Sequence, residues 1–166
     1  TLADRTAEDP RPAAVAVHRT PSGRPMAALS LPEDSGRYEV LSEIARGGMG
    51  RVFLARDRVL GREVAVKRLA KDLLGSDAAV ARFVDEAQVT GQLEHPGIVP
   101  VHSLGVTPEG EPYFAMKRVA GRSLEQVISA LAKSDEATVA EFGRLRLLMI
   151  FEQICMAVDY AHARGV

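Results

Sequence analysis

The chain has 166 residues, of which 46% are hydrophobic and 26% are charged, as in an ordinary globular domain. Its 21 lysines and arginines nearly balance 22 aspartates and glutamates, and a net charge of -1 predicts no nucleic-acid partner. The single cysteine, Cys155, excludes an intramolecular disulfide and favours a reducing compartment such as the cytoplasm. No apolar run approaches the roughly 20 residues that span a bilayer, so no membrane segment is expected in this chain.

Residues 1–36 differ from the rest of the chain in composition. Five of the nine prolines fall there, among Ala, Ser, Thr and charged residues, and no helical or strand periodicity holds. Such a segment buries too little apolar surface to offset the entropy of ordering it. We therefore predict a disordered leader or linker over 1–36, followed by one folded unit over 37–166.

The folded unit is expected to begin with strands and a glycine-rich turn. The turn Ala-Arg-Gly-Gly-Met-Gly covers 45–50 and joins the first two strands. In the third strand, Val64 and Val66 lie on one face and Ala65 and Lys67 on the other. The three strand candidates cover 38–44, 51–56 and 63–69.

A helix and a hairpin follow the third strand. Ser76 is the N-cap candidate of the helix, and Glu86 lies beside its apolar stripe. The stripe repeats at helical spacing in Val80, Phe83, Val84, Ala87 and Gly91. The hairpin would join strands over 98–106 and 112–119, which brings the number of expected strands to five.

The last part of the chain is expected to be helical. A capping box that starts at Ser123 opens a helix to about Ala132, and the longest helix covers about 142–164. The apolar face of the longest helix consists of Leu147, Ile150, Phe151, Ile154, Cys155 and Val158. This face needs a partner layer and would promote association if it stayed exposed. Cys155 is expected to be a small core residue there.

The glycine-rich turn has two interpretations. Glycines let backbone N–H groups approach phosphate oxygens closely, but a plain hairpin turn has the same composition and is the commoner case. Two nucleotide motifs are excluded by context. A dinucleotide-binding fingerprint needs a helix after its glycines, and a strand is expected here. A P-loop needs Gly-Lys followed by Ser or Thr, and the chain has no such sequence.

Lys67 stands in an unusual place for a lysine. It follows Val64-Ala65-Val66 on a strand, and lysine is rarely buried without a partner. The expected partner is an anion, either a phosphate or the carboxylate of Glu86. Glu86 alone would be interpreted as a solvated helix residue, but the order of strand lysine and then helix glutamate favours a functional pair.

These elements, in this order, resemble the N-lobe of a protein kinase. The resemblance continues through three further segments, namely His95–Pro100, Tyr113–Leu124 and Tyr160–Val166. It covers about residues 37–166 and is most similar to bacterial members of the eukaryotic-like serine/threonine kinase family. The implied fold is α+β: a five-stranded antiparallel sheet plus a C-helix, followed by the first two helices of a truncated C-lobe. The implied boundaries are an N-lobe over about 37–118, a hinge over about 117–121 and the C-lobe part over about 122–166.

The resemblance also implies an ATP site. Lys67 would hold the α- and β-phosphates, and Glu86 would pair with it and fix its reach. The backbone of the turn would cover the phosphates, which assigns roles to Ala45, Arg46, Gly47, Gly48, Met49 and Gly50. The adenine slot would be lined by Ile44, Val52, Ala65 and Met116. Hinge backbone groups would come from Lys117 and Val119.

The chain departs from the family pattern in two ways. Ala45 replaces the first glycine of the turn, which costs some flexibility. The sequence also contains no His-Arg-Asp loop, no asparagine for a second magnesium ion and no Asp-Phe-Gly, the groups that accept the substrate proton and bind Mg²⁺. The resemblance therefore implies ATP and Mg²⁺ as cofactors, no metal ligands in this chain, and no kinase activity of this polypeptide alone.

Three functions are left open at this point. The first is the ATP-binding portion of a serine/threonine kinase, whose partners would be ATP and protein substrates. The second is a non-catalytic nucleotide-binding or protein-interaction module. The third is a non-functional truncated product.

Overall fold

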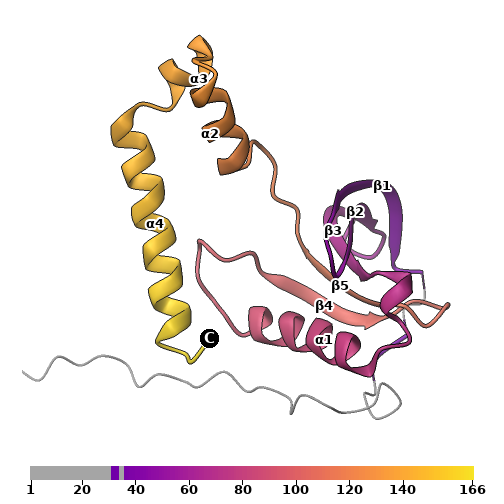
Figure 1. Ribbon diagram of the computed structural model, residues 1–166. Helices are drawn as coiled ribbons and strands as arrows, with labels where there is room; N and C mark the ends of the chain where they lie inside the picture. The colour runs from indigo at the N-terminus through magenta and orange to yellow at the C-terminus, as the bar shows by residue number, and fades with distance from the viewer. Residues whose placement is uncertain (1–30, 34–35) are drawn as a thin grey trace, which may run out of the picture.

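The computed structural model describes residues 31–33 and 36–166 of the chain (Figure 1). Most of the predicted leader over 1–36 lies outside the described residues. In the described part of the leader, the carbonyl of Pro32 accepts a hydrogen bond from the N–H of Val106 at 3.1 Å, and Glu33 forms a parallel bridge to Val106. This part of the leader therefore contacts the last residue of a strand in the folded unit.

A five-stranded antiparallel sheet forms the first half of the folded unit, with the strand order β1-β2-β3-β5-β4. The strands are β1 (Tyr38–Arg46), β2 (Gly50–Asp57), β3 (Arg62–Leu69), β4 (Val101–Val106) and β5 (Pro112–Lys117). The pairing of β2 with β3 is regular along its length, whereas β1 slips twice against β2. The sheet and the helices after it confirm the predicted fold class.

The last two strands are shorter than the sequence predicts. Residues 98–100 form no strand, because Ile98 closes a turn on the carbonyl of His95 at 2.9 Å and Pro100 has no N–H to donate. β5 ends at Lys117, and Val119 lies beyond it with 70% of its surface exposed. The hairpin itself is present where the sequence places it.

The two faces of β3 pack against different partners, as its alternation predicts. Val64 and Val66 belong to a buried cluster with Tyr38, Ala55, Tyr113 and Ala115. On the other face, Leu69 packs against the helix α1 (Asp77–Gly91) in a cluster with Val80, Phe83, Ala87 and Phe114. Ser76 caps α1 by accepting a hydrogen bond from the N–H of Ala79 at 3.3 Å. The predicted apolar stripe therefore fixes α1 on the Lys67 face of the sheet.

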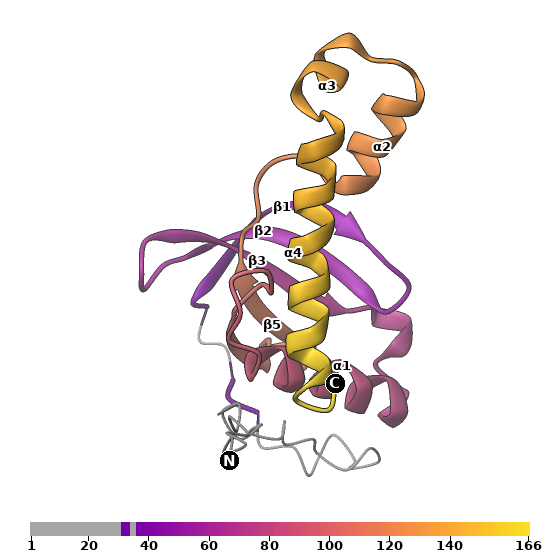
Figure 2. The ribbon, with the colours of Figure 1, turned by 90° about the vertical axis from the view of Figure 1, so that its left-hand side faces the viewer.

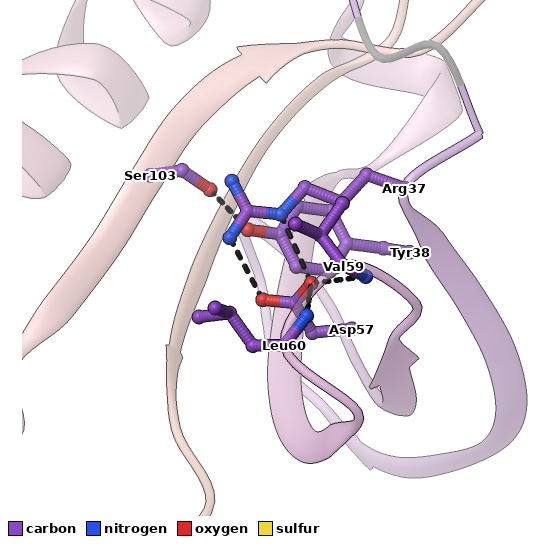
Figure 3. Close-up of polar contacts among 6 residues, drawn as sticks. All are labelled: Arg37, Tyr38, Asp57, Val59, Leu60 and Ser103. Atoms are coloured by element: carbon purple, nitrogen blue, oxygen red, sulfur yellow. Dashed lines mark hydrogen bonds and ion pairs between the residues drawn. The ribbon is translucent and has the colours of Figure 1, made fainter.

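The sheet is curled so that its two outermost strands meet. The hydroxyls of Tyr38 on β1 and Ser103 on β4 lie 2.8 Å apart (Figure 3). The ring of Tyr38 also packs edge-on against Tyr113 of β5, with a centroid distance of 5.7 Å. These contacts close one side of the apolar cluster that contains Val64 and Val66.

A buried carboxylate lies next to this contact. Asp57 is fully buried, and Arg37 donates to it twice, from Nε to Oδ1 at 3.0 Å and from Nη2 to Oδ2 at 2.8 Å (Figure 3). Oδ1 also accepts hydrogen bonds from the N–H groups of Val59 and Leu60 in the β2–β3 turn. Asp57 thus joins Arg37, which directly precedes β1, to the β2–β3 turn, and four hydrogen-bond donors surround its carboxylate.

Three helices follow the sheet, where the sequence predicts two. They are α2 (Leu124–Ala132), α3 (Glu136–Glu141) and α4 (Arg144–His162). The capping box of α2 is present as expected, with Ser123 Oγ accepting from the N–H of Gln126 and the Gln126 side chain accepting from the N–H of Ser123. The short helix α3 was not predicted, although Asp135 provides a cap by accepting from the N–H of Thr138 at 2.9 Å.

The long helix α4 runs back toward the sheet, and its C-terminal end lies beside the loop after α1 (Figures 1 and 2). Ala157 is buried there against Gly97, and the rings of Tyr160 and His95 are 5.1 Å apart. Most of the predicted apolar face of α4 is exposed within the described residues. The expectation that Cys155 is a core residue is therefore wrong in this structure, because nothing among the described residues covers it.

Candidate nucleotide site

Lys67 and Glu86 meet between β3 and α1. The Nζ of Lys67 lies 2.5 Å from Oε1 and 2.7 Å from Oε2 of Glu86. Lys67 lies on the β3 face that α1 covers, and Glu86 lies at the edge of the buried stripe of α1, so helix packing brings the carboxylate to the lysine. Their side chains are 19% and 41% exposed, which leaves the pair accessible to a ligand.

Two phenylalanine rings pack close to the ammonium of Lys67. Its Nζ lies 5.8 Å from the ring centroid of Phe83 on α1 and 5.5 Å from that of Phe114 on β5. Lys67 and Phe114 are direct partners in the β3–β5 register, so they share a face of the sheet. The predicted apolar stripe of α1 includes Phe83, and the cation–π contacts of the two phenylalanines were not predicted.

The glycine-rich turn is tied to the same face of the sheet. The N–H of Gly47 donates to the carbonyl of Gly50 at 2.8 Å, which closes the turn between β1 and β2. The carbonyl of Met49 accepts from the N–H of Ala70 at 3.1 Å, and the Met49 side chain packs against the cluster around Phe83. The turn therefore lies next to the Lys67–Glu86 pair.

The structure explains why residue 50 of the turn is glycine, but it gives no packing reason for glycine at positions 47 and 48. A Cβ on Gly50 would lie 2.3 Å from the carbonyl oxygen of Arg68, so the pairing of β2 with β3 requires glycine there. A Cβ on Gly48 would meet nothing within 4 Å, and neither Gly47 nor Gly48 has a positive φ. Packing and backbone conformation leave Gly47 and Gly48 unexplained. Close approach of a ligand to their backbone would explain both.

Three of the four residues expected to line the adenine slot are brought together by the strand register. Val52 pairs with Lys67, and Ala65 pairs with Met116, so these side chains share one face. Ala65 is buried, Val52 and Met116 are half-buried, and Ile44 at the end of β1 is 51% exposed. The apolar surface of Val52, Ala65 and Met116 lies on the Lys67 side of the sheet, whereas Ile44 lies in the register shift between Glu43 and Ala45 and has no partner in the β1–β2 register.

The expected hinge follows β5. The N–H of Lys117 donates to the carbonyl of Pro100 at 3.1 Å, so this donor is already used within the chain. Arg118 forms an ion pair with Glu63 of β3, a contact that was not predicted. A cavity of about 410 Å³ lies between this segment and the loop after α1, and Lys117 and Val119 line part of it.

The described part of the chain contains neither a metal-binding cluster nor a membrane-spanning helix. Among residues 31–33 and 36–166, no three His, Cys, Asp or Glu side chains are grouped so that they could hold a metal ion. No helix in this described part is both long enough and apolar enough to cross a membrane.

Comparison with known proteins identifies relatives of this chain. The protein kinase domain family matches residues 38–166. The serine/threonine-protein kinase PknD of Protochlamydia amoebophila is 38% identical over 143 residues, which cover 84% of this chain and 14% of the relative. PknD of Chlamydia trachomatis is 37% identical over 139 residues, which cover 78% of this chain and 14% of the relative.

Solved structures show the same relationship. The kinase domain of PknI from Mycobacterium tuberculosis superposes with a TM-score of 0.59 at 28% sequence identity, over 78% of this chain and 49% of that domain. The chain thus spans about 14% of the length of its curated relatives and about half of a solved kinase domain. It belongs to the protein kinase domain family, among the bacterial eukaryotic-like serine/threonine kinases.

Proposed function

We propose that residues 37–166 form the ATP-binding part of a serine/threonine protein kinase, which as a whole protein transfers the γ-phosphate of ATP to serine and threonine hydroxyls of protein substrates. The observation that carries this proposal is the Lys67–Glu86 ion pair beside the glycine-rich turn. A carboxylate that holds the lysine ammonium fixes its reach toward phosphate oxygens. The proposed divisions are the N-lobe over 37–118, the hinge over 117–121 and the C-lobe part over 122–166.

Each part of the site has a proposed role toward ATP. Lys67 binds the α- and β-phosphates, and backbone N–H groups of the turn around Gly47 and Gly48 cover them. Val52, Ala65, Met116 and Ile44 provide the apolar surface for adenine. The hinge backbone around Lys117 and Val119 meets the adenine edge, and the ion pair of Arg118 with Glu63 holds this segment against β3.

The residues present fit the phosphates and not the metal. Lys67 and the turn supply a cation and backbone donors, whereas magnesium prefers carboxylate and amide oxygens, and the described residues offer no such cluster. Mg²⁺ would neutralise charge on the phosphates during transfer. We propose that this 166-residue chain binds ATP weakly and does not transfer its phosphate, in a protein that acts in the cytoplasm.

Nucleotide titration with a matched control tests the binding site. The chain should bind ATP saturably, and Lys67→Met should weaken binding by about tenfold or more because the phosphates lose their cation. Lys71→Met is the control, since Lys71 is 79% exposed and pairs with Glu111 away from the site. Equal binding by Lys67→Met and the unmodified chain would overturn the assigned phosphate site.

Phosphate transfer is tested separately. With γ-labelled ATP, Mg²⁺ and a generic protein substrate, we expect no transfer by this chain above background, because its sequence contains neither the His-Arg-Asp nor the Asp-Phe-Gly motif of the family. Transfer by the unmodified chain that disappears in Lys67→Met would show that this chain is itself an active kinase.

A second candidate function, a non-catalytic interaction module, is favoured by the surface of α4. Leu145, Phe151 and Met156 are 73%, 63% and 59% exposed, on a helix with few buried side chains among the described residues. Exposed apolar surface of this kind marks an interaction site. Sedimentation of the purified chain tests this function. A monomer that binds no hydrophobic dye would count against it.

A further inference from the structure

We propose that Glu43 is a positioning residue for the glycine-rich turn: its carboxylate holds Arg46 and Arg51 together at the base of the turn and thereby raises the affinity for a nucleoside triphosphate. The inference rests on the proposed ATP site. It concerns side chains that lie behind the turn and make no contact with the nucleotide.

Two arginines face each other at the base of the turn. Arg46 ends β1, Arg51 is the second residue of β2, and the two are direct partners in the last pair of the β1–β2 register. Like charges directly opposite each other on neighbouring strands destabilise the pairing. Without a counter-ion, this pair would push apart the two strand ends that flank the turn, which are called its stems below.

Glu43 supplies the counter-ion to both arginines. Its Oε1 accepts from the Nε of Arg46 at 3.0 Å, and its Oε2 accepts from the Nε of Arg51 at 2.9 Å. A further hydrogen bond comes from Nη2 of each arginine. Hydrogen bonds from Arg51 and then Arg46 lower the pKa of the Glu43 carboxyl to about 2, so the carboxylate is charged at neutral pH. One side chain thus joins the strand before the turn to the strand after it.

Glu43, Arg46 and Arg51 are called the clamp below, and the clamp lies on the face of the sheet opposite Lys67. Arg51 pairs with Arg68 in the β2–β3 register, and the next pair is Val52 with Lys67. Side chains alternate between faces along a strand, so Arg51 and Lys67 lie on opposite faces. Glu43 therefore acts on a nucleotide beside Lys67 only through the turn.

The clamp is anchored in the sheet. The guanidinium carbons of Arg51 and Arg68 lie 5.1 Å and 5.4 Å from the ring centroid of Phe53. Arg68 in turn faces Glu111, the residue before β5, at 3.9 Å. These contacts run from β2 through β3 to the residue before β5, so the position of the Arg51 guanidinium is set by the sheet and not by the turn alone.

Positioning and simple electrostatics predict opposite results for removal of the Glu43 charge. Glu43→Gln takes away a negative charge near the phosphates, and Coulomb attraction alone would then strengthen binding of ATP. If Glu43 positions the turn, the stems separate, the backbone donors move away from the phosphates, and binding of ATP weakens. Adenosine has no phosphates, so its affinity should not change in either case.

The experiment is a calorimetric titration of ATP and of adenosine into the chain and its variants. We expect Glu43→Gln to weaken ATP binding about two- to fivefold, the range of a partly exposed ion pair, and to leave adenosine binding unchanged. The matched control is Glu39→Gln. Glu39 forms an ion pair with Arg58 across the same two strands, at the end away from the turn, at 3.3 Å.

A second variant tests whether Glu43 acts through Arg51. Arg51→Gln should weaken ATP binding as well, and Glu43→Gln should add little in that background. Equal or stronger ATP binding by Glu43→Gln, or a loss as large with Glu39→Gln, would overturn the positioning role. Failure of the proposed ATP site would look different, because Lys67→Met would then have no effect or the unmodified chain would not bind ATP.

Discussion

The ion pair of Arg37 with Asp57 should carry a large share of the stability of the sheet, and Asp57→Asn removes its charge while keeping the shape of the side chain. The four donors around the carboxylate, led by Arg37, lower the pKa of Asp57 from its usual 3.8 to about 2. A difference of this size corresponds to about 2 kcal/mol of preference for the charged form in the folded state. The Oδ1 of an asparagine can still accept from both turn N–H groups, whereas its Nδ2 is a donor and would face the donor Nη2 of Arg37. The expected loss in the free energy of unfolding is therefore about 2 kcal/mol.

Urea unfolding followed by circular dichroism measures this loss. For Asp57→Asn we expect a melting temperature roughly 5–10 °C lower in the corresponding thermal scan. The control is Glu39→Gln, which breaks an exposed pair with Arg58 and should cost less than about 0.5 kcal/mol. A loss for Asp57→Asn no larger than that of the control would refute the role given to the buried pair.

Four further outcomes follow from particular contacts. Because the pKa of Asp57 is lowered, the stability it contributes is present above about pH 4 and is lost as the pH falls toward 2; unfolding at several pH values should show the difference between the unmodified chain and Asp57→Asn shrinking in that window. Gly50→Ala should destabilise the sheet by about 1–3 kcal/mol in denaturant, since its Cβ would meet the Arg68 carbonyl, and unchanged stability would contradict the close approach. Gly48→Ala should leave the melting temperature unchanged and weaken ATP binding in a titration, and a strongly destabilised variant would point to a purely structural glycine. Ser123→Ala should destabilise α2 by about 1 kcal/mol because the N-cap is lost, so the helical circular-dichroism signal should fall at a lower temperature; a thermal scan identical to that of the unmodified chain would contradict the capping box.

Local patterns along the chain were enough to predict most of the fold. Alternation in β3 assigned Val64 and Lys67 to opposite faces, and the stripe of α1 fixed which side of the helix packs on the sheet. The ends of β4 and β5 were set too wide because Pro100 and the turn after His95 interrupt strand pairing. The helix α3 was missed because six residues hold too little periodicity, although Asp135 and Thr138 form a recognisable cap.

Contacts between distant strands could not be predicted from local patterns. Arg37 and Asp57 are 20 residues apart, and the β1–β2 pairing brings them together, since Asp57 is the partner of Tyr38. The clamp of Glu43 depends on a slip in the β1–β2 register, which no periodicity reveals. The pair of Lys67 and Glu86 is different, since an isolated strand lysine and a helix glutamate gave a reason to expect their contact.

The exposed face of α4 shows a limit of a different kind. Its apolar residues were expected to be covered or to cause association, and within the described residues most of them are exposed, including Phe151 and Cys155. Periodicity identifies a face that needs a partner, but it does not identify the partner. The burial of Ala157 against Gly97 shows the one place where the described chain covers α4 closely.

The most direct test of the ATP site is a double-mutant cycle on Lys67 and Glu86, measured by titration with ATP. We expect the unmodified chain to bind ATP, Lys67→Met and Glu86→Gln each to weaken binding, and the double variant to bind about as weakly as Lys67→Met, because Glu86 acts by holding Lys67. Losses that simply add would contradict the pairing as the basis of the site. No loss in either single variant would contradict a nucleotide site at this pair.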